Sequence, residues 1–114
     1  MMNDTQKAKY FALAALVARK SPSWPRLGCV IVKKGRVVGM GFNNTRKTHP
    51  KANTPYKTIH AEFQAMLGVD PKDLYGATAF VYREDAQGNP IISAPCAFCQ
   101  QALKEAGIKE VFNT

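Results

Sequence analysis

The chain has 114 residues, of which 46% are hydrophobic; this composition excludes an intrinsically disordered protein and suffices for one domain over residues 1–114. The longest apolar run, Tyr10–Ala18, is much shorter than the ~20 residues that a membrane-spanning helix needs. Three cysteines are an odd number, which argues against a disulfide framework. Free or metal-bound thiols in a reducing compartment are favoured, so we expect a cytoplasmic protein.

The formal net charge of +8 is unevenly distributed along the chain. Residues 1–60 contain twelve lysines and arginines and one acidic residue, whereas residues 61–114 contain four basic and seven acidic residues. This asymmetry predicts a basic face for phosphate-bearing ligands, either nucleotides or nucleic acid. A basic surface that serves solubility alone would give the same count.

The first predicted element is a helix that Asn3 or Asp4 caps and that runs to about Lys20, where the proline-containing segment 21–25 stops it. Its run Tyr10–Ala18 resembles the core of a short signal peptide, but no convincing cleavage site follows. We therefore interpret the run as a helix buried on most sides. It is also a candidate interface between the subunits of a homo-oligomer.

Two strands are predicted next, at Leu27–Val32 and Arg36–Phe42, with a hairpin turn at Lys33–Gly35 between them. A loop over residues 43–58 follows, with two prolines and four lysines or arginines. Because loops of this length in small domains are usually functional, we expect this one to contribute to the site.

The second half of the chain predicts helices that alternate with strands. A helix from about Ile59 ends near Gly68, the strand Ala77–Arg83 is apolar on both faces, and a helix over 96–106 precedes the strand Ile108–Phe112. This order predicts an α/β fold, namely a three-layer α/β/α sandwich whose mixed sheet has a β-hairpin at its edge.

The sequence APCAFC (residues 94–99) opens the last predicted helix. Proline suits the first position of a helix, and cysteines at i and i+3 lie on one face of the first turn, where the helix dipole stabilises thiolates. Two such thiolates are half of a tetrahedral zinc site. Cys96 and Cys99 could instead form a redox pair, but a thioredoxin-like motif normally follows the first strand of its fold.

The sequence TIHAEF (residues 58–63) begins the other helix and places His60 and Glu62 two residues apart. Residues i and i+2 do not share a helical face, so neither packing nor a surface ion pair explains them. At the start of a helix both side chains can lean over its open end, where His60 would reach a metal held by the cysteines. Glu62 would reach the space beside that metal, and three protein ligands would leave a place for water.

Together these motifs resemble the His-x-Glu…Pro-Cys-x-x-Cys signature of the zinc-dependent cytidine/deoxycytidylate deaminase superfamily. The likeness covers most of the chain, and the turn Gly41-Phe42-Asn43 is similar to the family's Gly-x-Asn turn. The resemblance implies a Zn²⁺ cofactor bound by His60, Cys96 and Cys99. It also implies a further strand after the segment matching Ile108–Phe112, which the sequence, ending at Thr114, lacks.

The resemblance also implies roles for individual residues. Glu62 would carry protons from the attacking water to the ring N3 and to the departing amine, as water attacks C4 of cytosine and ammonia leaves. Asn43 would contact the sugar or base, and the backbone N–H of Ala61 would contact the base carbonyl. Arg46 belongs to the basic loop and is a candidate to hold a substrate phosphate.

The expected function is hydrolytic deamination of cytosine in a free nucleoside or nucleotide, namely cytidine, deoxycytidine or dCMP. One alternative is a deaminase that acts on cytosine or adenine within single-stranded DNA or RNA, bound by a basic groove with stacking aromatic residues. The other is a structural zinc domain, which would need Cys29 or His49 as a fourth ligand and would leave Glu62 without a role. We interpret Cys29 as a buried apolar residue and His49 as an exposed one.

Overall fold

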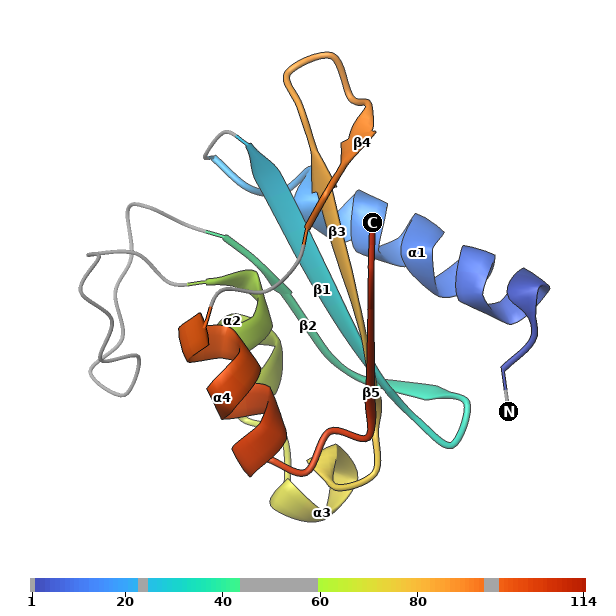
Figure 1. Ribbon diagram of the computed structural model, residues 1–114, viewed down its shortest axis with the longest axis vertical. Helices are drawn as coiled ribbons and strands as arrows, with labels where there is room; N and C mark the ends of the chain where they lie inside the picture. Colours follow the sequence, from blue (N-terminus) through green and yellow to red (C-terminus); the bar gives the residue numbers. More distant parts are fainter. Residues whose placement is uncertain (1, 23–24, 44–59, 94–96) are drawn as a thin grey trace.

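The computed structural model describes residues 2–22, 25–43, 60–93 and 97–114. In chain order, its elements are α1 (Asp4–Ala18), β1 (Arg26–Lys33), β2 (Arg36–Phe42), α2 (Ala61–Met66), α3 (Pro71–Leu74), β3 (Thr78–Glu84), β4 (Pro90–Ile91), α4 (Ala97–Glu105) and β5 (Glu110–Asn113). The sheet lies between α1 on one face and α2, α3 and α4 on the other (Figure 1). The predicted α/β sandwich is confirmed.

The sheet is mixed and has β3 near its centre. Its strands follow the order β2-β1-β3-β4, and β5 also pairs with β3. β1 is antiparallel to both of its neighbours, whereas β5 runs parallel to β3, with Thr78 opposite Glu110. The hairpin of β1 and β2 therefore forms one edge of the sheet, as predicted.

Alternate residues of β1 and β3 enter two separate apolar clusters, one on each face of the sheet. Val30, Val32 and Phe80 pack against α1, while Cys29, Ile31 and Val81 pack on the face of α2 and α4. All of the β3 residues except Arg83 are buried. This burial confirms that the third strand is covered on both faces.

Helix α1 begins where the sequence predicts, because Asn3 and Gln6 form a capping box. The Asn3 side chain accepts a hydrogen bond from the Gln6 backbone N–H at 2.8 Å, and the Gln6 side chain accepts one from the Asn3 N–H at 3.1 Å. Most of the run Tyr10–Ala18 is buried or half-buried, as predicted, and Leu16, which is 57% exposed, lies on the side of α1 that the sheet does not cover. The sheet covers one side of α1, and the role of this helix in a homo-oligomer stays a prediction.

Two short elements, α3 and β4, were not predicted from the sequence. α3 has four residues, and the Asp70 side chain caps it. β4 has two residues and returns antiparallel to β3, with Ile91 opposite Arg83. Elements this short have too few residues for a hydrophobic period to reveal them.

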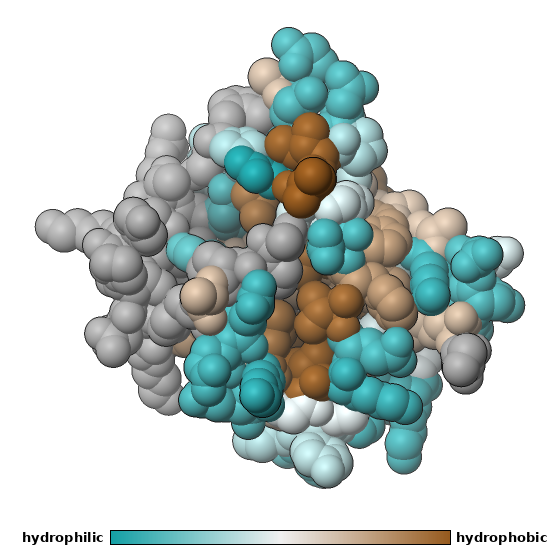
Figure 2. Space-filling view, in the orientation of Figure 1, coloured by the Kyte–Doolittle hydropathy of each residue, from teal (hydrophilic) through white to brown (hydrophobic). Residues whose placement is uncertain are grey.

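The strand β5 lies at the other edge of the described sheet and has exposed apolar residues nearby. Val111 is 38% exposed and Ile92 is 76% exposed. Figure 2, drawn in the orientation of Figure 1, shows apolar surface at the centre of the face toward the viewer, between the positions of α4 and β5. An open strand edge with apolar neighbours can accept another strand. Within the described part of the chain, no helix is long and apolar enough to span a membrane.

Candidate active site

The first turn of α2 lies directly on the end of β2 because a glycine of β2 leaves room for it. A Cβ atom at Gly41 would collide with the backbone carbonyl of Ala61. The Gln64 side chain of α2 also accepts a hydrogen bond from the Phe42 backbone N–H at 2.7 Å. These contacts hold the start of α2, and with it His60, which immediately precedes the helix, at one end of the sheet.

His60 lies against the start of the second helix of the predicted pair. Its Nδ1 atom is 3.2 Å from the Sγ atom of Cys99, although 39 residues separate them in the sequence. The imidazole does not cap α2, and the Cys99 side chain is fully buried. Two of the predicted ligands are therefore brought together, while the third, Cys96, lies outside the described residues.

Glu62 is buried beside this pair. Its side chain is 3% exposed, and its Oε1 atom has no hydrogen-bond partner among the described residues. Burial raises the pKa of the Glu62 carboxyl above its ordinary value. A hydrogen bond with its own backbone N–H, a hydrogen bond with Cys99 and the nearby His60 lower the pKa, but by less than burial raises it. A buried carboxyl that holds its proton more tightly is suited to both giving and taking protons near neutral pH.

The His60–Cys99 pair fits a zinc ion. Zn–N bonds of ~2.0–2.1 Å and Zn–S bonds of ~2.3 Å at a tetrahedral angle separate the two ligand atoms by roughly 3.5 Å. The observed Nδ1 to Sγ distance of 3.2 Å is close to this separation. The described residues alone contain no group of three potential ligands, so the complete set depends on Cys96. The Oε1 atom of Glu62, which has no hydrogen-bond partner among the described residues, would remain free to accept a proton from a water molecule beside the ion.

Cys29 lies in the core cluster on the same face of the sheet. It is fully buried, and its pKa is raised well above the ordinary value by burial and then by the charge of Glu62. The interpretation of Cys29 as a buried apolar residue is confirmed. The other candidate for a fourth ligand, His49, lies outside the described residues.

The Asn43 side chain joins the end of β2 to the start of β1. Its Oδ1 atom accepts a hydrogen bond from the Leu27 N–H at 2.9 Å, and its Nδ2 atom donates one to the Pro25 carbonyl at 3.0 Å. The amide thus holds the backbone at this end of the sheet. Its contact with substrate stays a prediction, and Arg46 lies outside the described residues.

Ala61 is the first residue of α2 and is fully buried. Its backbone N–H belongs to the first turn, whose amides an α-helix leaves without intrahelical partners. The predicted contact between this N–H and a base carbonyl is therefore compatible with the position of Ala61. It stays a prediction.

A buried hydrogen-bond network that the sequence did not suggest precedes the cysteine motif. The hydroxyl of Ser93, a residue 2% exposed, donates to the Val81 carbonyl at 2.8 Å, and the Ser93 N–H donates to the Thr114 carbonyl at 2.8 Å. The Thr114 hydroxyl donates to the Ile91 carbonyl at 2.7 Å. This network fixes the chain shortly before Pro95. A lone serine between apolar residues carries no sequence signal for such a role.

Comparisons with known proteins bear directly on these residues. The family model for the cytidine and deoxycytidylate deaminase zinc-binding region matches residues 4–114. The chloroplastic riboflavin biosynthesis protein PYRD of Zea mays is 40% identical, over an alignment that covers 95% of this chain and 25% of that protein. A tRNA-specific adenosine deaminase subunit of Schizosaccharomyces pombe is 37% identical, over 96% of this chain and 26% of its own length. The chain thus spans about a quarter of these relatives.

A third relative has nearly the length of this chain. The deoxycytidylate deaminase of Mycobacterium phage D29 is 28% identical, over 90% of this chain and 88% of its own length. The dCMP deaminase of cyanophage S-TIM5 has the same fold, with a TM-score of 0.74 at 23% identity, over 98% of this chain and 84% of that one. A diaminohydroxyphosphoribosylaminopyrimidine deaminase/reductase of Thermotoga maritima has a TM-score of 0.62 at 28% identity, over 96% and 29%. The predicted family and fold are confirmed.

Proposed function

Because the chain belongs to the cytidine and deoxycytidylate deaminase zinc-binding family, we propose that it is a zinc-dependent hydrolytic deaminase of cytosine in a free nucleoside or nucleotide. The observation that carries the proposal is the approach of His60 Nδ1 to within 3.2 Å of Cys99 Sγ, beside the buried carboxyl of Glu62. The basic first half of the chain and the similarity to a phage deoxycytidylate deaminase favour dCMP over a nucleoside.

His60, Cys96 and Cys99 would hold the zinc ion, which acts as a Lewis acid and lowers the pKa of a water molecule when it is bound. Glu62 accepts a proton from the attacking water and passes it to N3 of the cytosine ring. As the bond from C4 to the water oxygen forms and the C4–N bond breaks, Glu62 delivers the second proton to the departing amine. The products are the uracil base and ammonia.

The burial of Glu62 supports this role, because burial raises the pKa of the carboxyl and a carboxylate with a higher pKa is a stronger base toward the attacking water. A carboxyl that must also return the proton to N3 works best when its pKa lies nearer the operating pH. The start of α2, held on β2 by the contact at Gly41, keeps the carboxyl next to His60.

The test is ammonia release by the zinc-loaded protein. It is offered deoxycytidine, dCMP, diaminohydroxyphosphoribosylaminopyrimidine and a cytosine-containing single-stranded oligonucleotide, each with Glu62→Gln as the control. Release from deoxycytidine or dCMP that disappears in the variant supports the proposal. Release from the diaminohydroxyphosphoribosylaminopyrimidine alone would support hydrolytic deamination as the reaction and contradict cytosine as the substrate base. No release from any of the four by protein with bound zinc would refute the proposed cytosine deaminase.

The second candidate function is deamination of a base within single-stranded nucleic acid. The 37% identity to a tRNA-specific adenosine deaminase subunit and the excess of basic residues in the first 60 positions favour it. Affinity for an oligonucleotide should then fall steeply between low and moderate salt, because phosphate contacts release counterions. An affinity that is absent, or that does not change with salt, argues against this candidate.

A further inference from the structure

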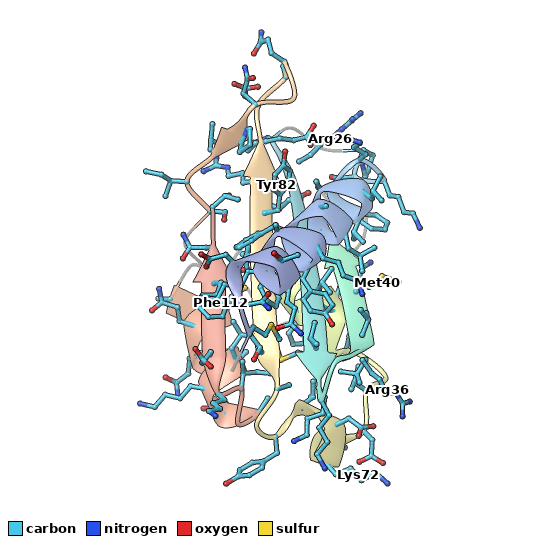
Figure 3. The ribbon with its side chains drawn as sticks, turned by 90° about the vertical axis from the view of Figure 1, so that its right-hand side faces the viewer. Arg26, Arg36, Met40, Lys72, Tyr82 and Phe112 are labelled. Atoms are coloured by element: carbon cyan, nitrogen blue, oxygen red, sulfur yellow. The ribbon has the colours of Figure 1, made fainter. Side chains whose placement is uncertain are left out.

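A second cleft, of about 600 Å³, lies at the other end of the sheet and on its other face. It is bounded by the first half of α1, the turn between β1 and β2, and the starts of β3 and β5. Figure 3 shows Phe112, one of its lining residues, beside the first half of α1. His60 and Glu62, in contrast, belong to the start of α2 on the opposite face. We call this feature the lysine cleft, after Lys7, Lys34 and Lys109, which line it.

The three lysines come from three separate parts of the chain, and Glu110 is the one acidic residue that lines the cleft with them. Like charges in one cavity repel each other, and their combined positive potential attracts an anion. A wall of low dielectric constant strengthens this potential. The Nζ atom of Lys7 already lies 4.4 Å from the centre of the Phe112 ring. Lys34 and Lys109 are exposed at the cleft and available for an anion.

The backbone of Lys34 gives independent support for a binding role. Lys34 has a φ of 51° and Gly35 a φ of 75°, which are the values of a tight hairpin turn that asparagine followed by glycine adopts best. A lysine in this left-handed conformation is less favourable than an asparagine. The Tyr10 hydroxyl donates a hydrogen bond to the Gly35 carbonyl at 3.2 Å, so the turn is held against α1. Local strain at a residue whose charge faces a cavity points to function.

The walls of the cleft are aromatic and aliphatic. Tyr10 and Phe112 line it together with Val32, and both rings pack against Phe80, with ring centres 5.3 Å and 5.5 Å away. This packing holds both rings in place, and Phe112, which is half-buried, offers a ligand more of its ring than Tyr10, which is 6% exposed. Apolar walls with a few charged groups and a volume of several hundred cubic ångströms are typical of small-molecule sites.

We propose that the lysine cleft binds a small ligand that consists of a planar ring bearing a phosphate group. The ring packs against the half-buried Phe112, in the place of the Lys7 ammonium that now lies over it, and the phosphate is bound by the ammonium groups of Lys34 and Lys109. A second hollow of the described surface, of about 320 Å³ beside β2 and α2, makes a useful contrast. It is lined by Val37, Met40, Val69 and other uncharged residues, so none of its described side chains carries a charge that would attract an anion.

The test uses phenyl phosphate and inorganic phosphate as probes for the full zinc-loaded chain, with binding followed by NMR. Phenyl phosphate should shift the signals of Tyr10 and Phe112 and should bind at least fivefold more tightly than inorganic phosphate. Equal affinity for the two probes would overturn the aromatic part of the proposal. Shifts confined to His60 and its neighbours would overturn the whole, because the probe would then occupy the candidate active site.

The decisive variant is Lys34→Asn, because it separates binding from folding. Asparagine suits the turn better than lysine, so the melting temperature should stay the same or rise, while the dissociation constant for phenyl phosphate should rise at least fivefold. Lys109→Gln should weaken binding similarly. The control Lys104→Gln removes an exposed charge from α4 on the opposite face and should change the affinity less than twofold. Unchanged binding in Lys34→Asn would refute the site.

Discussion

Glu62 and Glu84 are each 3% exposed, and each has an Oε1 atom without a hydrogen-bond partner among the described residues, yet their surroundings differ. Glu84 lies at the end of β3, 4.0 Å from the Arg19 guanidinium, and also hydrogen-bonds the Tyr82 side chain. Glu62 faces His60 and Cys99 instead. Glu84 therefore has a cationic partner at the surface, whereas Glu62 lies beside two of the proposed zinc ligands. The comparison predicts a structural role for Glu84 and is consistent with the catalytic role proposed for Glu62.

The largest expected effect comes from replacing the Glu62 carboxyl with an amide. Glu62→Gln should lower kcat by about 10²- to 10⁴-fold, the usual contribution of a general acid/base, with zinc still bound. Its stability should not fall, because an uncharged amide is less costly to bury than a carboxylate. The measurements are steady-state kinetics, zinc content and thermal unfolding.

Glu84→Gln is the matched control for the same chemical change. Its activity should stay within about twofold of the wild type, and its stability should fall by about 1 kcal/mol or less, since the exposed Arg19 contributes little. If Glu84→Gln lost as much activity as Glu62→Gln, the assignment of the two roles would be wrong.

The next effect concerns the packing that holds the start of α2, and with it Glu62, against β2. Gly41→Ala places a methyl group where the Ala61 carbonyl lies, so α2 must move away from β2. We expect a loss of about 3 kcal/mol of unfolding free energy, together with weaker zinc binding. Urea denaturation and zinc titration measure the two changes.

Gly88→Ala serves as the control, because Gly88 lies at the tip of the β3–β4 hairpin with open space around it and a φ of +82°. It should cost about 1 kcal/mol through backbone strain alone and leave zinc affinity unchanged. Equal losses of zinc affinity in both variants would show that the contact at Gly41 does not position the site.

A smaller effect is expected from the buried network before the cysteine motif. Ser93→Ala removes the hydroxyl that donates to the Val81 carbonyl and accepts from the Thr114 N–H at 3.0 Å. The loss should be about 1–3 kcal/mol, and zinc should bind more weakly because the chain leading to Cys96 is less fixed. Ser93→Thr, which keeps the hydroxyl, should retain more zinc affinity. Normal zinc affinity in Ser93→Ala would remove this positioning role.

The smallest effect concerns pH and the surroundings of Glu84. Burial, followed by the charge of Glu84 and a hydrogen bond with it, raises the pKa of Tyr82 above its ordinary value of 10.0. The native state therefore keeps the phenol proton at a pH where the unfolded chain loses it, so stability falls as pH rises above about 10. Tyr82→Phe should flatten this alkaline decline, measured by urea denaturation between pH 9 and about 11. An identical alkaline decline in stability in the wild type and in Tyr82→Phe would contradict this role of Tyr82.

Much of the fold follows from local patterns. The capping residue Asn3, the glycines that end the turns and the apolar β3 segment each act over a few residues, so the main helices and strands could be predicted within a few positions. The short α3 and β4 could not, because their form depends on neighbours already in place. The one-sided burial of α1 likewise depends on where the sheet lies.

The candidate site could be predicted from the sequence because zinc chemistry needs particular side chains at particular spacings, and His60, Glu62 and the two cysteines match that pattern. The structure brings His60 and Cys99 together, and the zinc site itself stays a prediction. Only the tertiary structure decided that Gly41 holds α2 against the sheet and that the Asn43 amide is engaged by backbone groups. It alone gathered Lys7, Lys34 and Lys109 at one cleft. Motifs within one turn are local in sequence, whereas contacts between distant segments exist only once the sheet has brought those segments together.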